Sequence, residues 1–316
     1  MASAEAKASQ RTVATTTQRR ARLSLRRREA LSAYLFIAPA VLGFILWTAG
    51  PMVYSAWMSL HEWNMVQPAK YIGLGNFREM WNDKLFWQSL KVTIVYAAVL
   101  VPLFQVLSLL TALLLNSSVR GVTFFRAAFY IPVVVPVVAA SFLWGWIFNP
   151  EFGLLNSYLR KLGFDKILWF QDPHWAMTAM IIMSLWTFGA TMVIYLAGLQ
   201  GIPAHLYEAA EIDGAGALRK FGTVTLPMMS PVIFFNFVLG LIGALQAFTQ
   251  AYIITDGGPQ NSTLFYTLYI FRKGFTDSEM GYASALAWVL FFIVLVLSLL
   301  VFRSFGRMVY YEDEGR

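Results

Sequence analysis

Six long apolar segments dominate the chain and restrict what it can fold into. Each holds about 20 or more residues, enough to cross roughly 30 Å of hydrocarbon as a helix. One soluble core cannot hide so much apolar surface, because 58% of the 316 residues are hydrophobic and only 13% are charged. We therefore predict an all-α integral membrane protein with six transmembrane helices. The predicted helices are Tyr34–Leu60, Gln88–Leu115, Ala127–Phe148, Trp175–Leu199, Pro231–Thr255 and Tyr282–Phe302.

Positive charge is concentrated at the amino terminus. Eight of the 24 Lys and Arg residues precede Leu31, and the whole chain has a net charge of +7. A basic segment before a first membrane helix favours the cytoplasmic side, where it meets anionic lipid. We therefore expect both termini in the cytoplasm. Because the membrane explains this charge, we do not expect nucleic acid as a partner.

These features divide the chain into four regions. We predict that residues 1–33 form a disordered basic cytoplasmic tail, since they lack hydrophobic periodicity. Residues 34–87 are predicted to hold the first transmembrane helix and an extracytoplasmic loop. Residues 88–304 are predicted to form a core of five transmembrane helices with a long cytoplasmic loop at 201–230. Residues 305–316 are predicted to be a second cytoplasmic tail.

The residues that are missing from the sequence also limit its function. The chain has no cysteine, and its histidines, His61, His174 and His205, are far apart, so we expect neither a metal site nor a cofactor. The centres of the predicted spans contain no ionisable residue, whereas proton-coupled transporters place one there. No phosphate-binding loop occurs either. We therefore expect no enzymatic activity, and expect any energy for uphill transport to come from a partner chain.

The loop at 201–230 carries the most informative motif. It reads Pro203-Ala-His-Leu-Tyr-Glu-Ala-Ala-Glu-Ile-Asp-Gly214 and continues to Leu226-Pro227. Pro203 suits the first turn of a helix, the small residues allow another protein to approach closely, and Gly214 tolerates a turn with positive φ. We predict a short helix followed by a turn.

This loop resembles the EAA loop of ABC importer permeases, in which Glu-Ala-Ala is followed by a glycine and later by an aliphatic residue and proline. The resemblance implies a type I ABC importer permease bundle. It also implies that the short helix is a coupling helix that docks into an ATPase subunit. The candidate coupling residues are Glu208, Ala209, Ala210, Asp213, Gly214, Leu226 and Pro227.

A second stretch narrows the resemblance. Thr255-Asp-Gly-Gly-Pro259 and Gly281-Tyr-Ala-Ser-Ala285 are similar to segments of the carbohydrate-uptake branch of these permeases. The resemblance implies half of the translocation pathway of an ATP-driven sugar importer in a bacterial or archaeal cytoplasmic membrane. The implied partners are a second permease, two ABC ATPase subunits and an extracytoplasmic solute-binding protein. Two alternatives stay open, namely an importer of glycerol phosphate or a polyol, and a membrane channel or scaffold that acts alone.

Polar side chains recur at helical spacing on the predicted fourth and fifth spans. Hydroxyl, amide and indole groups can bind a sugar without any charge, and in sugar permeases the middles of these two helices line the pathway. An equally open explanation is that small and hydroxyl residues only pack the helices together. The candidate pathway residues are Trp186, Thr187, Thr191, Gln246 and Gln250.

Overall fold

The computed structural model describes residues 27, 29–30, 32–117 and 120–305. The predicted tails at 1–33 and 305–316 therefore lie almost entirely outside the described residues. The chain forms two compact units, residues 1–57 and residues 58–316. An apolar helix begins at Ser32, in the first unit, and continues to Ser59, two residues into the second. It includes a π-helical turn, η1 (Ile45–Ala49), and then α2 (Gly50–Ser59).

The membrane-spanning helices agree with the prediction of six spans when each bent helix pair counts as one crossing. Four helices are long and apolar enough to cross a membrane without a sharp bend: Ser32–Ser59, Lys84–Leu115, Ala217–Ile254 and Met280–Ser304. Two further crossings are helix pairs bent at short breaks. Val122–Val134 meets Val137–Ile147 at 100°, and Pro173–Leu185 meets Gly189–Gln200 at 48°.

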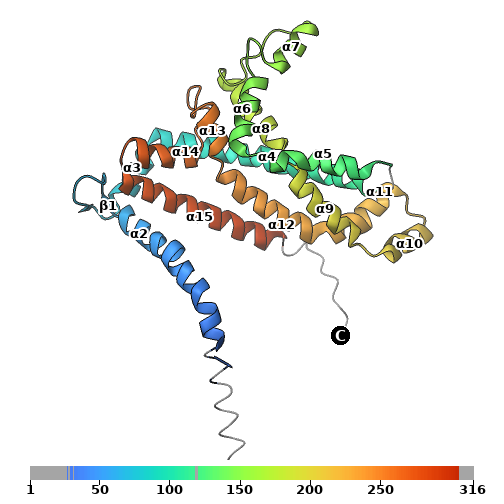
Figure 1. Ribbon diagram of the computed structural model, residues 1–316, viewed down its shortest axis with the longest axis horizontal. Coiled ribbons are helices and arrows are strands. Elements are labelled where there is room, and N and C mark those ends of the chain that lie inside the picture. Colours follow the sequence, from blue (N-terminus) through green and yellow to red (C-terminus); the bar gives the residue numbers. More distant parts are fainter. Residues whose placement is uncertain (1–26, 28, 31, 118–119, 306–316) are drawn as a thin grey trace, which may run out of the picture. The chain divides into compact units, whose positions relative to one another are not determined.

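The second unit contains one short antiparallel hairpin, in which His61 lies opposite Tyr71. The other regular elements in its described part are helices. Its elements, shown in Figure 1, are β1 (His61–Glu62), β2 (Lys70–Tyr71), α3 (Gly75–Asn82), α4 (Lys84–Leu115), α5 (Val122–Val134), α6 (Val137–Ile147), α7 (Leu154–Lys161), α8 (Pro173–Leu185), α9 (Gly189–Gln200), α10 (Ala204–Ile212), α11 (Ala217–Lys220), η2 (Phe221–Thr225), α12 (Leu226–Leu245), α13 (Thr249–Ile254), α14 (Tyr266–Phe271), η3 (Arg272–Thr276) and α15 (Met280–Phe305).

Helix α4 is central to the packing of this unit. It contacts α8, α9, α12 and α14, while α15 packs against α3, α12 and α14 (Figure 1). A proline within α4, Pro102, does not interrupt the helix. The helix that contains the fifth predicted span begins at Ala217, within the predicted loop 201–230. The loop between α9 and this helix therefore carries only α10 and its two flanking turns.

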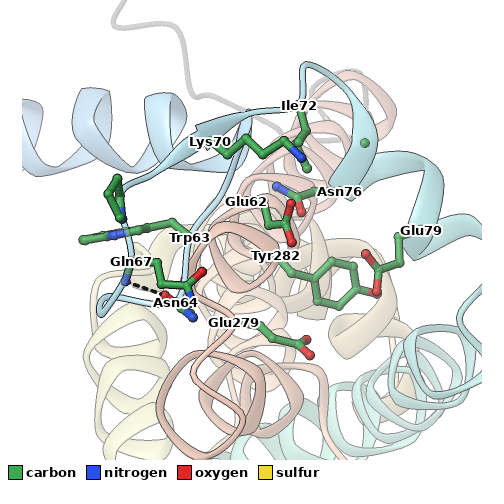
Figure 2. Close-up of a pocket in the computed structure, with 12 residues that line it drawn as sticks. Glu62, Trp63, Asn64, Gln67, Lys70, Ile72, Asn76, Glu79, Glu279 and Tyr282 are labelled. Atoms are coloured by element: carbon green, nitrogen blue, oxygen red, sulfur yellow. Dashed lines mark hydrogen bonds between the residues drawn. The ribbon is translucent and has the colours of Figure 1, made fainter.

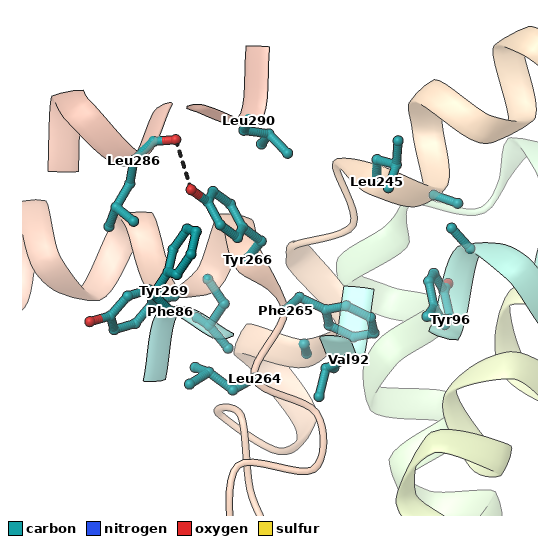
Figure 3. Packing of buried hydrophobic residues seen from close by; sticks show 14 of the residues in the cluster. Phe86, Val92, Tyr96, Leu245, Leu264, Phe265, Tyr266, Tyr269, Leu286 and Leu290 are labelled. Atoms are coloured by element: carbon teal, nitrogen blue, oxygen red, sulfur yellow. Dashed lines mark hydrogen bonds between the residues drawn. The ribbon is translucent and has the colours of Figure 1, made fainter. Parts of the chain in front are cut away.

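Polar contacts reinforce the apolar packing between α4, α14 and α15 (Figure 3). Tyr266 is fully buried, its hydroxyl donates to the Leu286 carbonyl at 3.0 Å, and its amide donates to Thr93 Oγ1 at 2.8 Å. Lipid tails are as apolar as leucine, so apolar burial alone stabilises helix association weakly in a membrane. Directional contacts such as those of Tyr266 therefore fix how the three helices meet.

Asp83, at the start of α4, makes a second set of hydrogen bonds between these helices. One carboxylate oxygen caps the helix by accepting from the Leu85 amide at 2.8 Å. The other accepts hydrogen bonds from the hydroxyls of Tyr269 and Tyr282, the latter at 2.7 Å. The Lys273 ammonium lies 6.0 and 5.7 Å from the centroids of these two rings. One carboxylate thus joins α4, α14 and α15.

The hydrogen bonds that the Asp83 carboxylate accepts lead to a pH-dependent prediction. Partial burial raises the pKa of Asp83, but hydrogen bonds from Tyr269, Tyr282 and two backbone amides outweigh it, so the pKa lies below its ordinary value of 3.8. The stabilisation is therefore present above about pH 4 and is lost as the pH falls through the lowered pKa. We expect Asp83→Asn to lose about 1 kcal/mol of unfolding free energy at pH 7.

Thermal unfolding of the detergent-solubilised assembly that contains this chain, followed between pH 7 and pH 3, tests this. The difference between the wild type and Asp83→Asn should shrink toward pH 3. The exposed Asp165→Asn serves as the matched control and should show no such trend. A constant difference across this range would contradict the role given to the Asp83 carboxylate.

Candidate functional site

Three membrane-spanning segments are interrupted, and the interruptions adjoin one cavity. Between α5 and α6, Pro136 has no amide hydrogen to donate and the chain turns by 100°. Residues Trp186–Phe188 separate α8 from α9, and residues Gln246–Phe248 separate α12 from α13. Interrupted membrane helices are tolerated where the backbone lines a cavity or is buried in protein, and in transporters they commonly form the binding site.

The cavity has a volume of about 680 Å³ and is lined by residues from all three interruptions, among them Val135, Trp186 and Gln246. It also receives side chains from α4. None of the described residues that line it carries a charge. Its polar groups are hydroxyls, amides and indoles, from Tyr96, Gln105, Trp144, Ser184, Trp186, Thr187, Gln246, Thr249 and Gln250. The cavity can therefore offer neutral hydrogen bonds and aromatic faces, and no compensating charge for an ionic ligand.

Four of the five candidate pathway residues line this cavity, namely Trp186, Thr187, Gln246 and Gln250. Thr191 does not, because the break before α9 ends the continuous helical stripe on which the prediction depended. One turn further, Tyr195 is fully buried and donates to Gln105 Oε1. That end of the stripe therefore packs against α4.

The cavity also contains residues that the sequence analysis did not select. The Trp144 ring stacks on Phe148, with centroids 5.2 Å apart, and meets the Trp186 ring edge-on at 5.9 Å. The Trp144 Nε1 atom is buried and has no hydrogen-bond partner among the described residues. Trp144 reaches Trp186 only because α6 turns away from α5. The pair Val135-Pro136 is the one local signal of this turn, since proline disfavours the helical conformation of the residue before it.

A larger cavity lies beside the β1–β2 hairpin. It has a volume of about 840 Å³, and Figure 2 shows the carboxylates of Glu62, Glu79 and Glu279 along it, with Lys70 and Tyr282. It touches none of the three interruptions. Its acidic lining also differs from the neutral lining of the first cavity, so we assign the candidate solute pathway to the smaller cavity.

The predicted short helix in the loop is α10, and Gly214 forms the turn that ends it. Gly214 has φ +74°, its amide donates to the Glu211 carbonyl at 2.9 Å, and the Ala215 amide donates to the Ala210 carbonyl at 2.9 Å. These two bonds form a Schellman motif, in which a residue with positive φ ends a helix. The sequence prediction of a helix followed by a glycine turn is therefore confirmed.

One side of α10 is held by the chain that follows it. The Tyr207 hydroxyl lies 3.0 Å from Thr225 Oγ1, and the Lys220 ammonium lies 2.5 Å from a Glu211 carboxylate oxygen. This ion pair lowers the pKa of Glu211 through a hydrogen bond and charge attraction. Leu226 and Pro227, two of the candidate coupling residues, form the first turn of α12.

The other side of α10 is open. Glu208, Ala209 and Asp213 are exposed, Ala210 is half-buried, and Ile212 has 87% of its surface exposed. Leu218, on α11, is 86% exposed. Two aliphatic side chains, one on α10 and one on α11, are thus exposed to contact by a protein partner.

Comparisons with known proteins agree with this architecture. The family described as "Binding-protein-dependent transport system inner membrane component" matches residues 92–308. The probable ABC transporter permease protein YesP of Bacillus subtilis is 42% identical, over 91% of this chain and 94% of its own length. The lactose transport system permease protein LacF of Rhizobium radiobacter is 36% identical, over 90% and 97% respectively.

A solved structure gives the same fold. A bacterial ABC transporter involved in the import of the acidic polysaccharide alginate superimposes with a TM-score of 0.81, at 22% identity, over 92% of this chain and all of that one. At this identity the likeness concerns the fold alone. The type I permease bundle expected from the sequence is therefore confirmed.

Proposed function

Because the chain belongs to the family of binding-protein-dependent transport system inner membrane components, we propose that it forms half of the translocation pathway of an ATP-driven sugar importer. The observation that carries this proposal is the neutral cavity where three interrupted spans meet. The other half of the pathway is a second permease. Two ABC ATPase subunits dock on the cytoplasmic side, and an extracytoplasmic binding protein delivers the solute.

A neutral solute suits the lining of the cavity best. Amides and hydroxyls bind sugar hydroxyls, and the rings of Trp144 and Trp186 offer apolar faces to a pyranose ring. A glycerol phosphate would need a cationic partner, because burying an unpaired charge is costly. No described lining residue supplies a cation, so the sugar is favoured over the phosphate ester on this half of the pathway. A neutral polyol fits the same chemistry.

Coupling between the two sites follows from the chain connections. Helix α9 runs from the break at Trp186–Phe188 toward α10. After α10 the chain continues through α11 and η2 into α12, which ends at the break at Gln246–Phe248. A displacement of α10 by the ATPases is therefore passed along two packed helices to two of the three interruptions. ATP hydrolysis stays on the partner chains, and this chain converts their movement into a change of cavity access.

The proposal includes an orientation, with both termini in the cytoplasm. The chain contains no cysteine, so single cysteines can be labelled without background. We expect an impermeant maleimide to label Ala217→Cys from the cytoplasmic side only and Asp165→Cys from the outside only, since both positions are exposed. Labelling of Asp165→Cys from the cytoplasm would contradict the six-span topology.

Affinity purification of the full chain from its own membrane tests the assembly. We expect a second permease and a P-loop ATPase to remain bound in mild detergent. The competing function, a channel or scaffold that acts alone, predicts that the chain purifies without either subunit. Recovery of the folded chain as an isolated protein would therefore contradict the importer.

A further inference from the structure

The segment between α6 and α8 has a fixed conformation. The side chain of Asn156, on α7, is fully buried and makes four hydrogen bonds. Its amide group donates to the carbonyls of Pro150 and Ile167, and its oxygen accepts from the Ile167 amide and the Trp169 indole. Each donor and acceptor of this amide is therefore used to hold α7 against the chain that follows it.

Helix α7 is apolar on two sides. Its inner side chains, Leu155 and Leu159, pack on the cluster around Phe148 and Trp169. Its outer side carries Leu154, Tyr158 and Leu162 at intervals of four residues, which places them in one stripe. These three side chains are 44%, 57% and 72% exposed, so nothing in the described part of this chain covers the stripe. Phe152 and Phe164 extend the exposed apolar surface at the two ends of the helix.

The chemistry around the stripe points to lipid. The two helices that flank α7, α6 and α8, each belong to a bent pair that counts as one membrane crossing. Two apolar side chains of α6, Phe142 and Trp146, are exposed as well. Arg160 and Lys161 lie in the last turn of α7, and the Lys161 ammonium is 5.5 Å from the Tyr158 ring centroid. Aromatic rings beside basic side chains are typical of helices in the headgroup region, where the cations meet phosphates.

We propose that α7 is an interfacial helix, whose outer stripe lies among the lipids of the extracytoplasmic leaflet. The apolar surface of α6 would then continue onto α7 without a water-exposed gap. An anchored α7 holds the ends of α6 and α8 at a fixed depth, and both of these helices border the neutral cavity. The inference goes beyond the proposed importer and depends only on the membrane topology.

Spin-label accessibility in the assembled importer in lipid nanodiscs tests this inference. A nitroxide at Tyr158→Cys should collide readily with oxygen, which is concentrated in the bilayer, and several-fold less with a water-soluble nickel chelate than a water-exposed label does. Gln67→Cys, in the exposed β1–β2 loop, is the aqueous control, and Phe142→Cys, on the exposed face of α6, is the lipid control.

Either of two results would overturn the inference. Equal access of oxygen and nickel at position 158 would place the stripe in water. Exclusion of both reagents would mean that a protein surface, from the second permease or from the binding protein, covers it. Because the readout is accessibility and not uptake, either result would leave the proposed transport function intact.

Discussion

Gly214→Arg should abolish uptake while the chain remains folded and inserted in the membrane. Any side chain at φ +74° costs roughly 1–2 kcal/mol, and this strain would loosen the turn that ends α10. A Cβ at this position would meet no atom within 4 Å, so the larger effect lies outside the chain. The arginine would project from the exposed end of α10, where the ATPase is proposed to dock.

Gly216→Arg is the matched control for this variant. Gly216 also has no atom within 4 Å of an added Cβ, but its φ of −69° suits any residue. The experiment compares ATP-dependent uptake and the amount of ATPase that co-purifies. We expect Gly214→Arg to lose both and Gly216→Arg to retain more of each. Normal uptake in Gly214→Arg would remove the coupling role of α10.

Trp186→Ala should cause the second large effect, on the solute side of the protein. The change removes an aromatic face from the cavity and leaves the Trp144 ring without its edge contact at 5.9 Å. We expect the solute concentration that gives half-maximal uptake to rise by about tenfold or more, since a buried aromatic contact contributes more than about 1.4 kcal/mol. Gln246→Ala removes one neutral hydrogen-bonding group and should raise the solute concentration for half-maximal uptake by about tenfold or less.

Thr191→Ala is the control for the pathway variants, because Thr191 lies outside the cavity lining. Initial uptake rates across solute concentrations separate a binding defect from an assembly defect, provided that the amount of co-purified ATPase is unchanged. If Trp186→Ala and Gln246→Ala both transported normally, the solute contacts would belong to the partner permease.

The six spans were predictable because composition and length suffice to identify an apolar segment of about 20 residues. The interruptions were not, because they depend on neighbouring helices. Pro102 and Pro136 both lie inside predicted spans, yet α4 continues through Pro102 while the chain turns by 100° at Pro136. Gly189 shows a similar dependence. An added Cβ there would lie 2.0 Å from the Phe129 carbonyl oxygen on α5, a contact that no local pattern encodes.

The two parts of the candidate site differed in how far the sequence could predict them. Helix α10 and its glycine turn were predictable, because local residue preferences and a motif specify them together. The solute pathway was predicted in part. An ideal helix would place Thr187 and Thr191 on one face, but the break before α9 separates them. Trp144 was missed because its place beside Trp186 depends on the bend between α5 and α6.

Uptake by the reconstituted importer tests the central claim most directly. The chain, its second permease, the ATPases and the binding protein would be placed in sealed proteoliposomes with a radiolabelled neutral sugar. We predict accumulation that requires ATP and the binding protein, and that persists when the proton gradient is collapsed. Accumulation by the purified chain alone, driven by a pH gradient and without ATP, would contradict the account.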